Sequence, residues 1–201
     1  LNWLAYSIFE TLGDKEWAKQ LFEKAESFPE NIRELCDLAE SVSEILKDKE
    51  WQLKIYKKAE ENAKEYSDFY ELADHVFAKL GDGEWASELY HKAEGKAEDC
   101  CDLLSLAECF IEKLGEGEGA RRLYEKAEKN AEDSMDFVVL ADSLRETLGD
   151  KDWAKKLYKK AENETENVRE LCDLADSIFE TFRDNEWQTK IYKKAEVLAK
   201  E

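Results

Sequence analysis

The side chains that could perform chemistry are few in this sequence, and no spacing arranges them in a reactive pattern. His75 and His91 are the two histidines, and the chain has no His-Glu-x-x-His motif, Cys-x-x-Cys motif or glycine-rich phosphate loop. Cys100 or Cys101 would need a nearby base to act as a nucleophile, and none is evident. Carboxylates occur throughout the chain, so their pairing says nothing about catalysis. We therefore expect no enzymatic activity, no cofactor and no metal site.

The charge balance narrows the classes of partner. The 201 residues include 49 Asp or Glu and 30 Lys or Arg, which gives a formal net charge of −19. Binding to nucleic acid or to an anionic membrane requires a basic surface, so neither is predicted. The longest apolar run, residues 137–141, is far too short to span a bilayer.

The cysteines indicate the redox environment. Five is an odd number, which does not fit the disulfide framework of a secreted domain. We therefore expect reduced thiols in a cytoplasmic protein.

A strict repeat in the sequence predicts the structural elements that must position these residues. A Leu-Ala pair recurs every 34 residues without an insertion, which indicates an array of structural repeats. The pairs are Leu4-Ala5, Leu38-Ala39, Leu72-Ala73, Leu106-Ala107, Leu140-Ala141 and Leu174-Ala175. The pattern predicts hairpins at about residues 1–30 (truncated), 31–64, 65–98, 99–132, 133–166 and 167–201. We expect the chain to be a fragment of a longer repeat protein.

Each unit has the pattern of a helical hairpin. Apolar residues three and four apart, from Phe137 to Leu148, form one stripe on a first helix. Gly149 can then end that helix in the left-handed conformation, and Asp150 can cap the next helix. The second helix is expected to bury Trp153 and Tyr158. One hairpin of this size cannot bury both apolar faces, so neighbouring hairpins must stack.

A 34-residue helix-turn-helix unit of this kind resembles the tetratricopeptide repeat (TPR) family over the whole chain. The second helix carries the resemblance, because Ala154, Tyr158 and Ala161 match the family's small-aromatic-small spacing. The first helix departs from the family, with Leu-Ala in place of Leu-Gly, and approaches the related Sel1-like repeats. The resemblance implies an all-α protein: an α-solenoid of about six 34-residue repeats, wound as a right-handed superhelix. It also implies that the first helices line a concave groove that holds peptides or partner proteins.

The positions that would face this groove form three rows. We call the row directly after each Leu-Ala pair the first acidic row, the row four residues later the second acidic row, and the row between them the apolar seam. The first acidic row is Tyr6, Glu40, Asp74, Glu108, Asp142 and Asp176. The second is Glu10, Glu44, Ala78, Glu112, Glu146 and Glu180. The seam is Phe9, Ser43, Phe77, Ile111, Arg145 and Phe179, with Tyr70 contributed by a neighbouring position.

Carboxylate rows beside an apolar seam would attract a basic or amphipathic segment through long-range field and buried anchors. The chain is therefore predicted to be a protein-interaction scaffold for a protein or peptide partner. Charge reversal to lysine at four positions of the first acidic row, Glu40, Asp74, Glu108 and Asp142, is expected to leave folding intact. Other interpretations stay open: acidic residues that only solvate a helix face, a structural spacer or self-associating module of a larger multidomain regulator (through open array ends), or an engineered repeat array without a dedicated ligand.

Two further positions stand out in the second helices. A lysine recurs at Lys24, Lys58, Lys92, Lys126, Lys160 and Lys194, and we expect it to have a structural role. Gly119 replaces the tryptophan that the other units carry. Loss of a buried indole is expected to leave a destabilising cavity, which is either neutral drift in a stable array or a locally soft point that a partner side chain could enter.

Overall fold

A computed structural model of the chain describes residues 1–29 and 31–200. The chain is 82% helical, and the described residues contain no strand. The prediction of an all-α protein is therefore confirmed. None of the described helices combines the length and the apolar character needed to cross a membrane.

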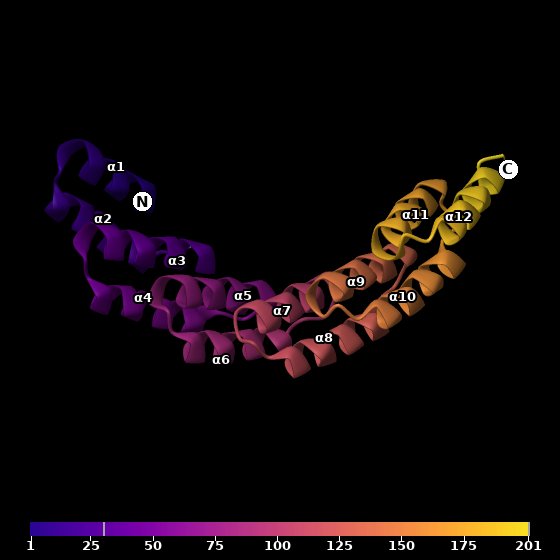
Figure 1. Cartoon of the computed structure of the whole chain (residues 1–201). Helices are drawn as coiled ribbons and strands as arrows, with labels where there is room; N and C mark the ends of the chain where they lie inside the picture. Colours follow the sequence, from indigo (N-terminus) through magenta and orange to yellow (C-terminus); the bar gives the residue numbers. More distant parts are fainter. Residues whose placement is uncertain (30, 201) are drawn as a thin grey trace. The chain divides into compact units, whose positions relative to one another are not determined.

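Residues 1–97 form one compact unit. Its elements are α1 (Asn2–Leu12), α2 (Lys15–Ser27), α3 (Ile32–Ser41), η1 (Val42–Leu46), α4 (Lys49–Asn62), α5 (Tyr66–His75), η2 (Val76–Leu80) and α6 (Gly83–Glu94). The helices pack as the pairs α1–α2, α3–α4 and α5–α6, and the first helices of neighbouring pairs contact each other (Figure 1). The π-helical segments η1 and η2 end two of these first helices.

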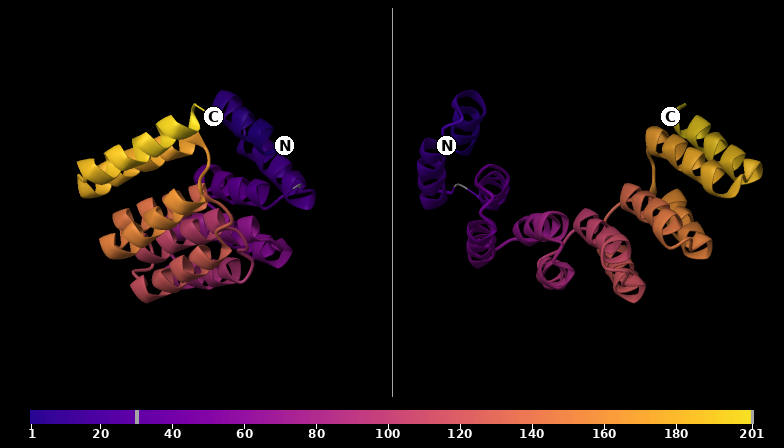
Figure 2. Two further views of the ribbon diagram at one scale, coloured as in Figure 1. Left: turned by 90° about the vertical axis from the view of Figure 1, so that its right-hand side faces the viewer. Right: turned by 60° about the vertical axis from the view of Figure 1, so that its left-hand side comes forward.

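Residues 98–201 form the second compact unit. Its helices are α7 (Cys100–Glu112), α8 (Gly117–Asn130), α9 (Ser134–Thr147), α10 (Lys151–Glu164), α11 (Val168–Phe182) and α12 (Asn185–Leu198). They pack as the pairs α7–α8, α9–α10 and α11–α12, and α9 contacts both α7 and α11 (Figure 2). The same hairpin arrangement is thus present in both units.

Local signals begin and end these helices as the sequence predicts. Asp150 accepts a hydrogen bond from the backbone N–H of Trp153 at 3.0 Å and thereby caps α10. Four other second helices begin with the same cap, at Asp14, Asp48, Asp82 and Asp184. The turn before the second helix has a positive φ in every hairpin, at Gly13, Lys47, Gly81, Gly115, Gly149 and Arg183. Four of these six residues are glycine because that conformation crowds a Cβ atom.

The core of each hairpin lies between its two helices and their neighbours. The alanine of every Leu-Ala pair is fully buried, at Ala5, Ala39, Ala73, Ala107, Ala141 and Ala175. A side chain that ends at Cβ lets two helix backbones approach closely, and a larger residue would force them apart. The aromatic residues of the second helices are fully buried as well, at Phe22, Tyr56, Tyr90, Tyr124 and Tyr158. Each hairpin therefore buries a small residue on its first helix and, in the first five hairpins, a large aromatic residue on its second.

Candidate functional site

The first acidic row is largely engaged in hydrogen bonds within its own hairpin. The hydroxyl of Tyr192 donates to Asp176 Oδ1 at 2.5 Å. The hydroxyls of Tyr90 and Tyr158 donate in the same way to Asp74 and Asp142. Each of these aspartates therefore holds the second helix of its hairpin to the first.

Members of this row also bind the following hairpin. Glu40 contacts His75 Nδ1 at 2.6 Å and Lys79 Nζ at 2.7 Å. Ser143 Oγ donates to Glu108 at 3.1 Å, and the corresponding Ser177 donates to Asp142 at 3.2 Å. These contacts join α3 to α5 and its η2 extension, α7 to α9, and α9 to α11.

Asp142 is half-buried, unlike Glu108 and Asp176 of the same row, which are exposed. Burial raises the pKa of its carboxyl above the ordinary value, although hydrogen bonds from Tyr158 and Ser177 act in the opposite direction. Burial and the neighbouring Asp142 carboxylate also raise the pKa of the Tyr158 hydroxyl. The expectation that charge reversal here leaves folding intact is therefore wrong for Asp142, since a lysine would lose both accepted bonds in a half-buried position.

In the second acidic row, every carboxylate is on the surface. Glu10, Glu44, Glu112, Glu146 and Glu180 are all exposed. Arg145, from the apolar seam, donates to Glu146 at 2.6 Å and lies 3.9 Å from Asp142. The negative charge of α9 is therefore partly balanced, whereas α3 presents Glu44 to solvent.

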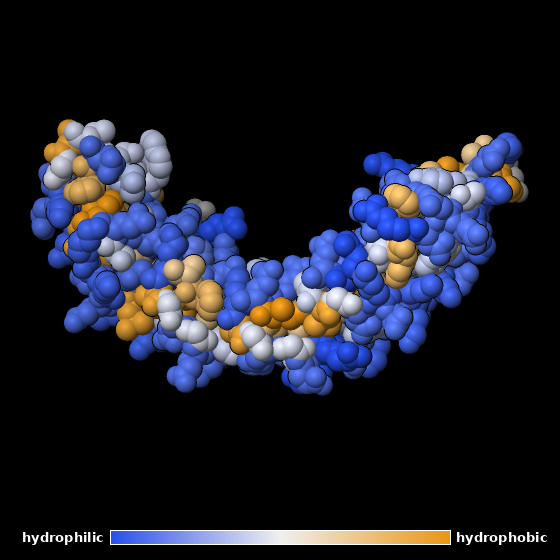
Figure 3. All heavy atoms as spheres, viewed as in Figure 1, coloured by the Kyte–Doolittle hydropathy of each residue, from blue (hydrophilic) through white to orange (hydrophobic). Residues whose placement is uncertain are grey.

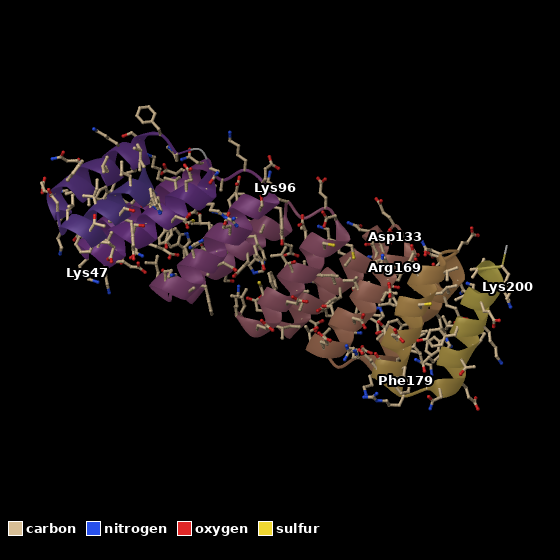
Figure 4. All side chains as sticks on the ribbon, turned by 90° about the horizontal axis from the view of Figure 1, so that it is seen from above. Lys47, Lys96, Asp133, Arg169, Phe179 and Lys200 are labelled. Atoms are coloured by element: carbon tan, nitrogen blue, oxygen red, sulfur yellow. The ribbon has the colours of Figure 1, made fainter. Side chains whose placement is uncertain are left out.

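The apolar seam is half-buried. This holds for Phe9, Phe77, Ile111 and Phe179. Cations lie over the two end rings: Lys15 Nζ is 5.8 Å from the centroid of Phe9, and the Arg183 guanidinium carbon is 5.1 Å from that of Phe179, which lies near the end of α11 (Figure 4). Tyr70 packs against Tyr66 and Tyr90, with ring centroids 5.5 Å and 5.9 Å away.

A cavity of about 730 Å³ lies at the first helices of the first unit, between α1, the end of α2 and α3. It brings together Tyr6, Glu40 and Glu44 from the predicted rows. Sequence reasoning missed further residues of its lining, among them Trp3, Phe28, Glu34 and Asp37. Trp3 and Phe28 could have been noticed, because no other hairpin carries an aromatic residue at either position.

Acidic side chains predominate in the lining of this cavity. Four carboxylates line it, from Glu34, Asp37, Glu40 and Glu44, and no Lys, Arg or His is among its described lining residues. The apolar lining includes Leu35 and Leu38. A cation attached to an apolar stem is the chemical group that matches both parts of this lining.

On the second helices, a glutamate joins neighbouring hairpins by binding an indole and a lysine. Trp153 Nε1 donates to Glu128 at 2.8 Å, and Lys160 Nζ donates to the same carboxylate at 2.5 Å. We call this arrangement the clasp. The indole–glutamate bond recurs as Trp51–Glu26, Trp85–Glu60 and Trp187–Glu162. In these three junctions Lys58 and Lys194 reach backbone carbonyls and Lys92 reaches the carboxylate, so the recurrent lysines bind the preceding hairpin.

The clasp changes the titration of its carboxylates. Burial alone would raise the pKa of Glu128, but hydrogen bonds from Lys160 and Trp153 outweigh it and lower the pKa below the ordinary value. The pKa of Glu162 is lowered in the same way by Lys190 and Trp187 against the effect of burial.

The structure corrects the interpretation of Gly119. The equivalent tryptophans are not core residues, since Trp51, Trp85, Trp153 and Trp187 are half-buried and Trp17 is exposed. At Gly119 the space is already filled, because an added Cβ would lie 2.6 Å from Cδ1 of Phe110. The predicted cavity is therefore absent, and the adjacent first helix supplies the missing bulk.

The reactive groups of the chain are held in structural environments. No group of three His, Cys, Asp or Glu side chains in the described part of the chain could hold a metal ion. The five cysteines form no disulfide. Burial raises the pKa of Cys100 to about 12 and raises that of Cys36 as well, which is the reverse of what activates a thiolate.

Comparison with known proteins adds no family assignment. No model of a known protein family matches the chain. A search of curated proteins gives no match either.

Proposed function

We propose that this chain is a TPR-like α-solenoid of about six 34-residue repeats, wound as a right-handed superhelix, that acts as a protein-interaction scaffold. Its partner is a basic, amphipathic segment bound by the first helices, and its role is not enzymatic. The repeating sequence pattern and the contacts between neighbouring first helices in each unit support this architecture.

The observation that carries the proposal is the cavity beside α1 and α3. Its apolar lining can take the non-polar side of a partner helix, and its exposed carboxylates Asp37 and Glu44 can pair with lysines or arginines on the other side. The exposed carboxylates of the second acidic row extend the negative field along the first helices of each unit. Such a field increases the association rate of a basic partner more than it increases the final affinity.

The structure also changes which residues should be tested. Asp142 and Asp176 are poor choices, because their loss would break hydrogen bonds to Tyr158 and Tyr192. Asp37 and Glu44 are good choices, because both line the cavity and both are exposed.

The test measures binding of a labelled Lys- and Arg-rich amphipathic peptide by fluorescence anisotropy at low and high salt. We expect micromolar binding that weakens with salt and falls by more than about tenfold in Asp37→Lys/Glu44→Lys. The matched control is Glu23→Lys/Glu88→Lys, which makes the same charge change at exposed positions on second helices of the same unit.

Two results would contradict the proposal. One is equal loss of binding in the two double variants, which would show that net charge and not the cavity governs capture. The other is equal binding of a peptide of the same composition whose lysines and leucines are scrambled, since only an amphipathic segment matches both parts of the lining.

A further inference from the structure

In the second unit, a cation of one second helix lies over the tryptophan near the start of the next. The guanidinium carbon of Arg121 on α8 is 5.2 Å from the ring centroid of Trp153 on α10. Lys155 Nζ on α10 is 5.7 Å from the ring centroid of Trp187 on α12. The face of an indole attracts a cation at such distances, because its π electrons make the face negative. Each of these half-buried indoles therefore receives a positive charge from the preceding hairpin.

Carboxylates complete this arrangement at the junction of α8 and α10. Asp150 Oδ1 accepts the backbone N–H of Trp153 at 3.0 Å as the helix cap, and Arg121 Nη1 lies 3.7 Å from Asp150 Oδ2. One oxygen of this aspartate thus caps the helix while the other faces the cation. Glu125, one turn further along α8, lies 3.8 Å from Arg121 Nε. The guanidinium is held between an aromatic face and two carboxylates.

The residue that supplies the cation varies with the tryptophan of the next hairpin. Its equivalents along the chain are Lys19, Leu53, Ser87, Arg121, Lys155 and Thr189. The three basic residues each precede a hairpin that carries the tryptophan, and Ser87 precedes the hairpin in which Gly119 replaces it. Leu53 is the exception, because the next hairpin carries Trp85. The junction of α4 and α6 therefore has the indole without the basic residue that accompanies it elsewhere.

A cavity of about 700 Å³ lies at this junction, in the groove between α4 and α6. Its lining includes Leu53, Lys57 and Glu61 of α4 and Asp82 and Trp85 at the start of α6. The corresponding cavity between α2 and α4, which Lys19 lines, measures about 380 Å³. Leu53 is 38% exposed, and Figure 3 shows hydrophobic residues at the surface where α4 lies in Figure 1. An apolar surface thus lies where α2, α8 and α10 carry a basic side chain.

Part of the lining is already bonded. Trp85 Nε1 donates to Glu60 at 2.9 Å, and Lys92 Nζ donates to the same carboxylate at 2.5 Å, which is the clasp of this junction. Asp82 Oδ1 accepts the backbone N–H of Trp85 at 3.0 Å, the same cap that begins α10. Within residues 1–29 and 31–200, no cation lies over the ring of Trp85. The indole face, Asp82 Oδ2 and the exposed Glu61 carboxylate are therefore available to a ligand.

One cation, Lys57, lines the cavity without lying over the indole. Its equivalent on α10 is Lys159, one turn beyond Lys155. Lys155 nonetheless lies over the indole of α12, so a lysine at this place is compatible with a second cation over the ring. The α8 helix has Glu125 at the same place, whereas on α4 the carboxylate comes one turn later, at Glu61.

We infer that the cavity between α4 and α6 binds an arginine side chain of a partner protein. The guanidinium would lie over the Trp85 ring with Asp82 Oδ2 and Glu61 as its anions, and the aliphatic stem would pack on Leu53. Arginine fits better than lysine, because a planar guanidinium can stack on an indole and bond to a carboxylate at the same time. The inference goes beyond the proposed function, since this site lies on second helices and shares no lining residue with the cavity beside α1 and α3.

The experiment follows the indole N–H signals of the isotope-labelled chain by NMR during titration with acetyl-arginine methylamide. The Trp85 signal, assigned with Trp85→Phe, should shift saturably with a Kd on the order of 1 mM. The signals of Trp153 and Trp187 should shift far less, because in-chain cations already lie over their rings. The matched probe is acetyl-citrulline methylamide, which keeps the shape of arginine without its charge and should bind about tenfold more weakly.

Reciprocal substitutions at two junctions make the test specific. Leu53→Arg supplies the cation from within the chain and should weaken binding at Trp85 by about tenfold or more. Arg121→Leu removes the cation from the α8–α10 junction and should make the Trp153 signal respond to the arginine probe. Asp82→Asn keeps a helix cap but removes one anion, so it should weaken binding about threefold.

The control for Leu53→Arg is Val139→Arg, which makes the same charge change at an exposed apolar position on α9 and should leave binding unchanged. The backbone signals verify that each variant is folded. The inference is overturned if the Trp85 signal does not shift, if Leu53→Arg binds as tightly as wild type, or if the citrulline probe binds as tightly as the arginine probe. Equal binding of acetyl-leucine methylamide would also overturn it, since the cavity would then take any apolar side chain.

Discussion

The hairpins α7–α8 and α9–α10 follow one another in the chain and share the same sequence pattern, yet they fill the same space in different ways. In the second of them, Trp153 packs edge-on against Tyr124 at 6.4 Å and donates to Glu128. In the first, Gly119 stands at the equivalent place and Phe110 of the adjacent helix occupies the volume. The residue equivalent to Phe110 in α9 is the smaller Leu144.

This difference separates the two tasks of the tryptophan. Its bulk can be supplied from either helix of the hairpin, because close packing depends on the volume filled and not on which chain segment fills it. Its indole N–H cannot be replaced by a phenylalanine, so the clasp to the preceding glutamate exists only where the tryptophan does. Trp153 therefore contributes as a hydrogen-bonding cover of the junction and not as a buried core residue.

The largest loss of stability should come from replacing Trp153. Trp153→Gly should lower the free energy of unfolding by about 3 kcal/mol, because it removes the ring on Tyr124 and the bond to Glu128 and places a glycine in the first turn of α10. Urea denaturation followed by circular dichroism measures the change. Adding Leu144→Phe should recover only part of it. Full recovery would show that the clasp adds nothing beyond volume.

The tyrosine hydroxyls of the two hairpins also differ, in the charge of their hydrogen-bond partners. The Tyr158 hydroxyl donates to the Asp142 carboxylate, whereas the Tyr124 hydroxyl bonds to two neutral hydroxyls, of Ser143 and Thr147. Tyr158→Phe should therefore cost about 2 kcal/mol and Tyr124→Phe about 1 kcal/mol, because bonds to charged groups are the stronger ones. Thermal melts of the two variants side by side test the difference, and equal losses would contradict it.

Much of the local fold is readable from the sequence because the signals are repeated. The period of 34 residues, the Asp caps and the buried alanines are each local patterns with a direct physical cause. Gly119 shows where such reading stops. Its partner, Phe110, lies nine positions earlier, and only a comparison of both positions across all six units reveals that one enlarged as the other shrank.

The candidate site was predicted less well, because exposure and hydrogen bonding depend on neighbours outside the pattern. Asp142 and Glu146 are four residues apart on one helix, so the sequence treats them alike. Asp142 is half-buried and bonded to Tyr158 and Ser177, while Glu146 is exposed. The cavity residue Trp3 was missed for the opposite reason, since it departs from the pattern that drew attention to the others.

A smaller effect, with a change of sign, tests the packing around Gly119. Gly119→Ala should lower the free energy of unfolding by about 1 kcal/mol, because the new Cβ would lie 2.6 Å from Phe110 Cδ1 and the gain in helix propensity does not offset that overlap. In a Phe110→Val background the same change should stabilise by about 1 kcal/mol, since the space is then free. Chemical denaturation of all four proteins in this cycle gives the coupling. The same sign in both backgrounds would mean that Phe110 moves away at little cost.

The smallest effect concerns the charge in the clasp, whose indole the α7–α8 hairpin lacks at Gly119. Lys160 and Trp153 lower the pKa of Glu128, so its carboxylate stabilises the fold above the ordinary value of 4.5, and this contribution is lost as the pH falls through the lowered pKa. Glu128→Gln should therefore cost about 0.5–1 kcal/mol at pH 7, and the difference from wild type should shrink below pH 4.5. Glu164→Gln, at an exposed position of the same unit, is the control and should show no such dependence.

Asp142 should show the opposite pH dependence, because its pKa is raised. Burial disfavours its charged form, so protonation in acid removes that cost. The prediction is contradicted if the difference in the free energy of unfolding between Glu128→Gln and wild type grows as the pH falls. Burial would then determine the pKa of Glu128, and the bonds from Lys160 and Trp153 would not lower it.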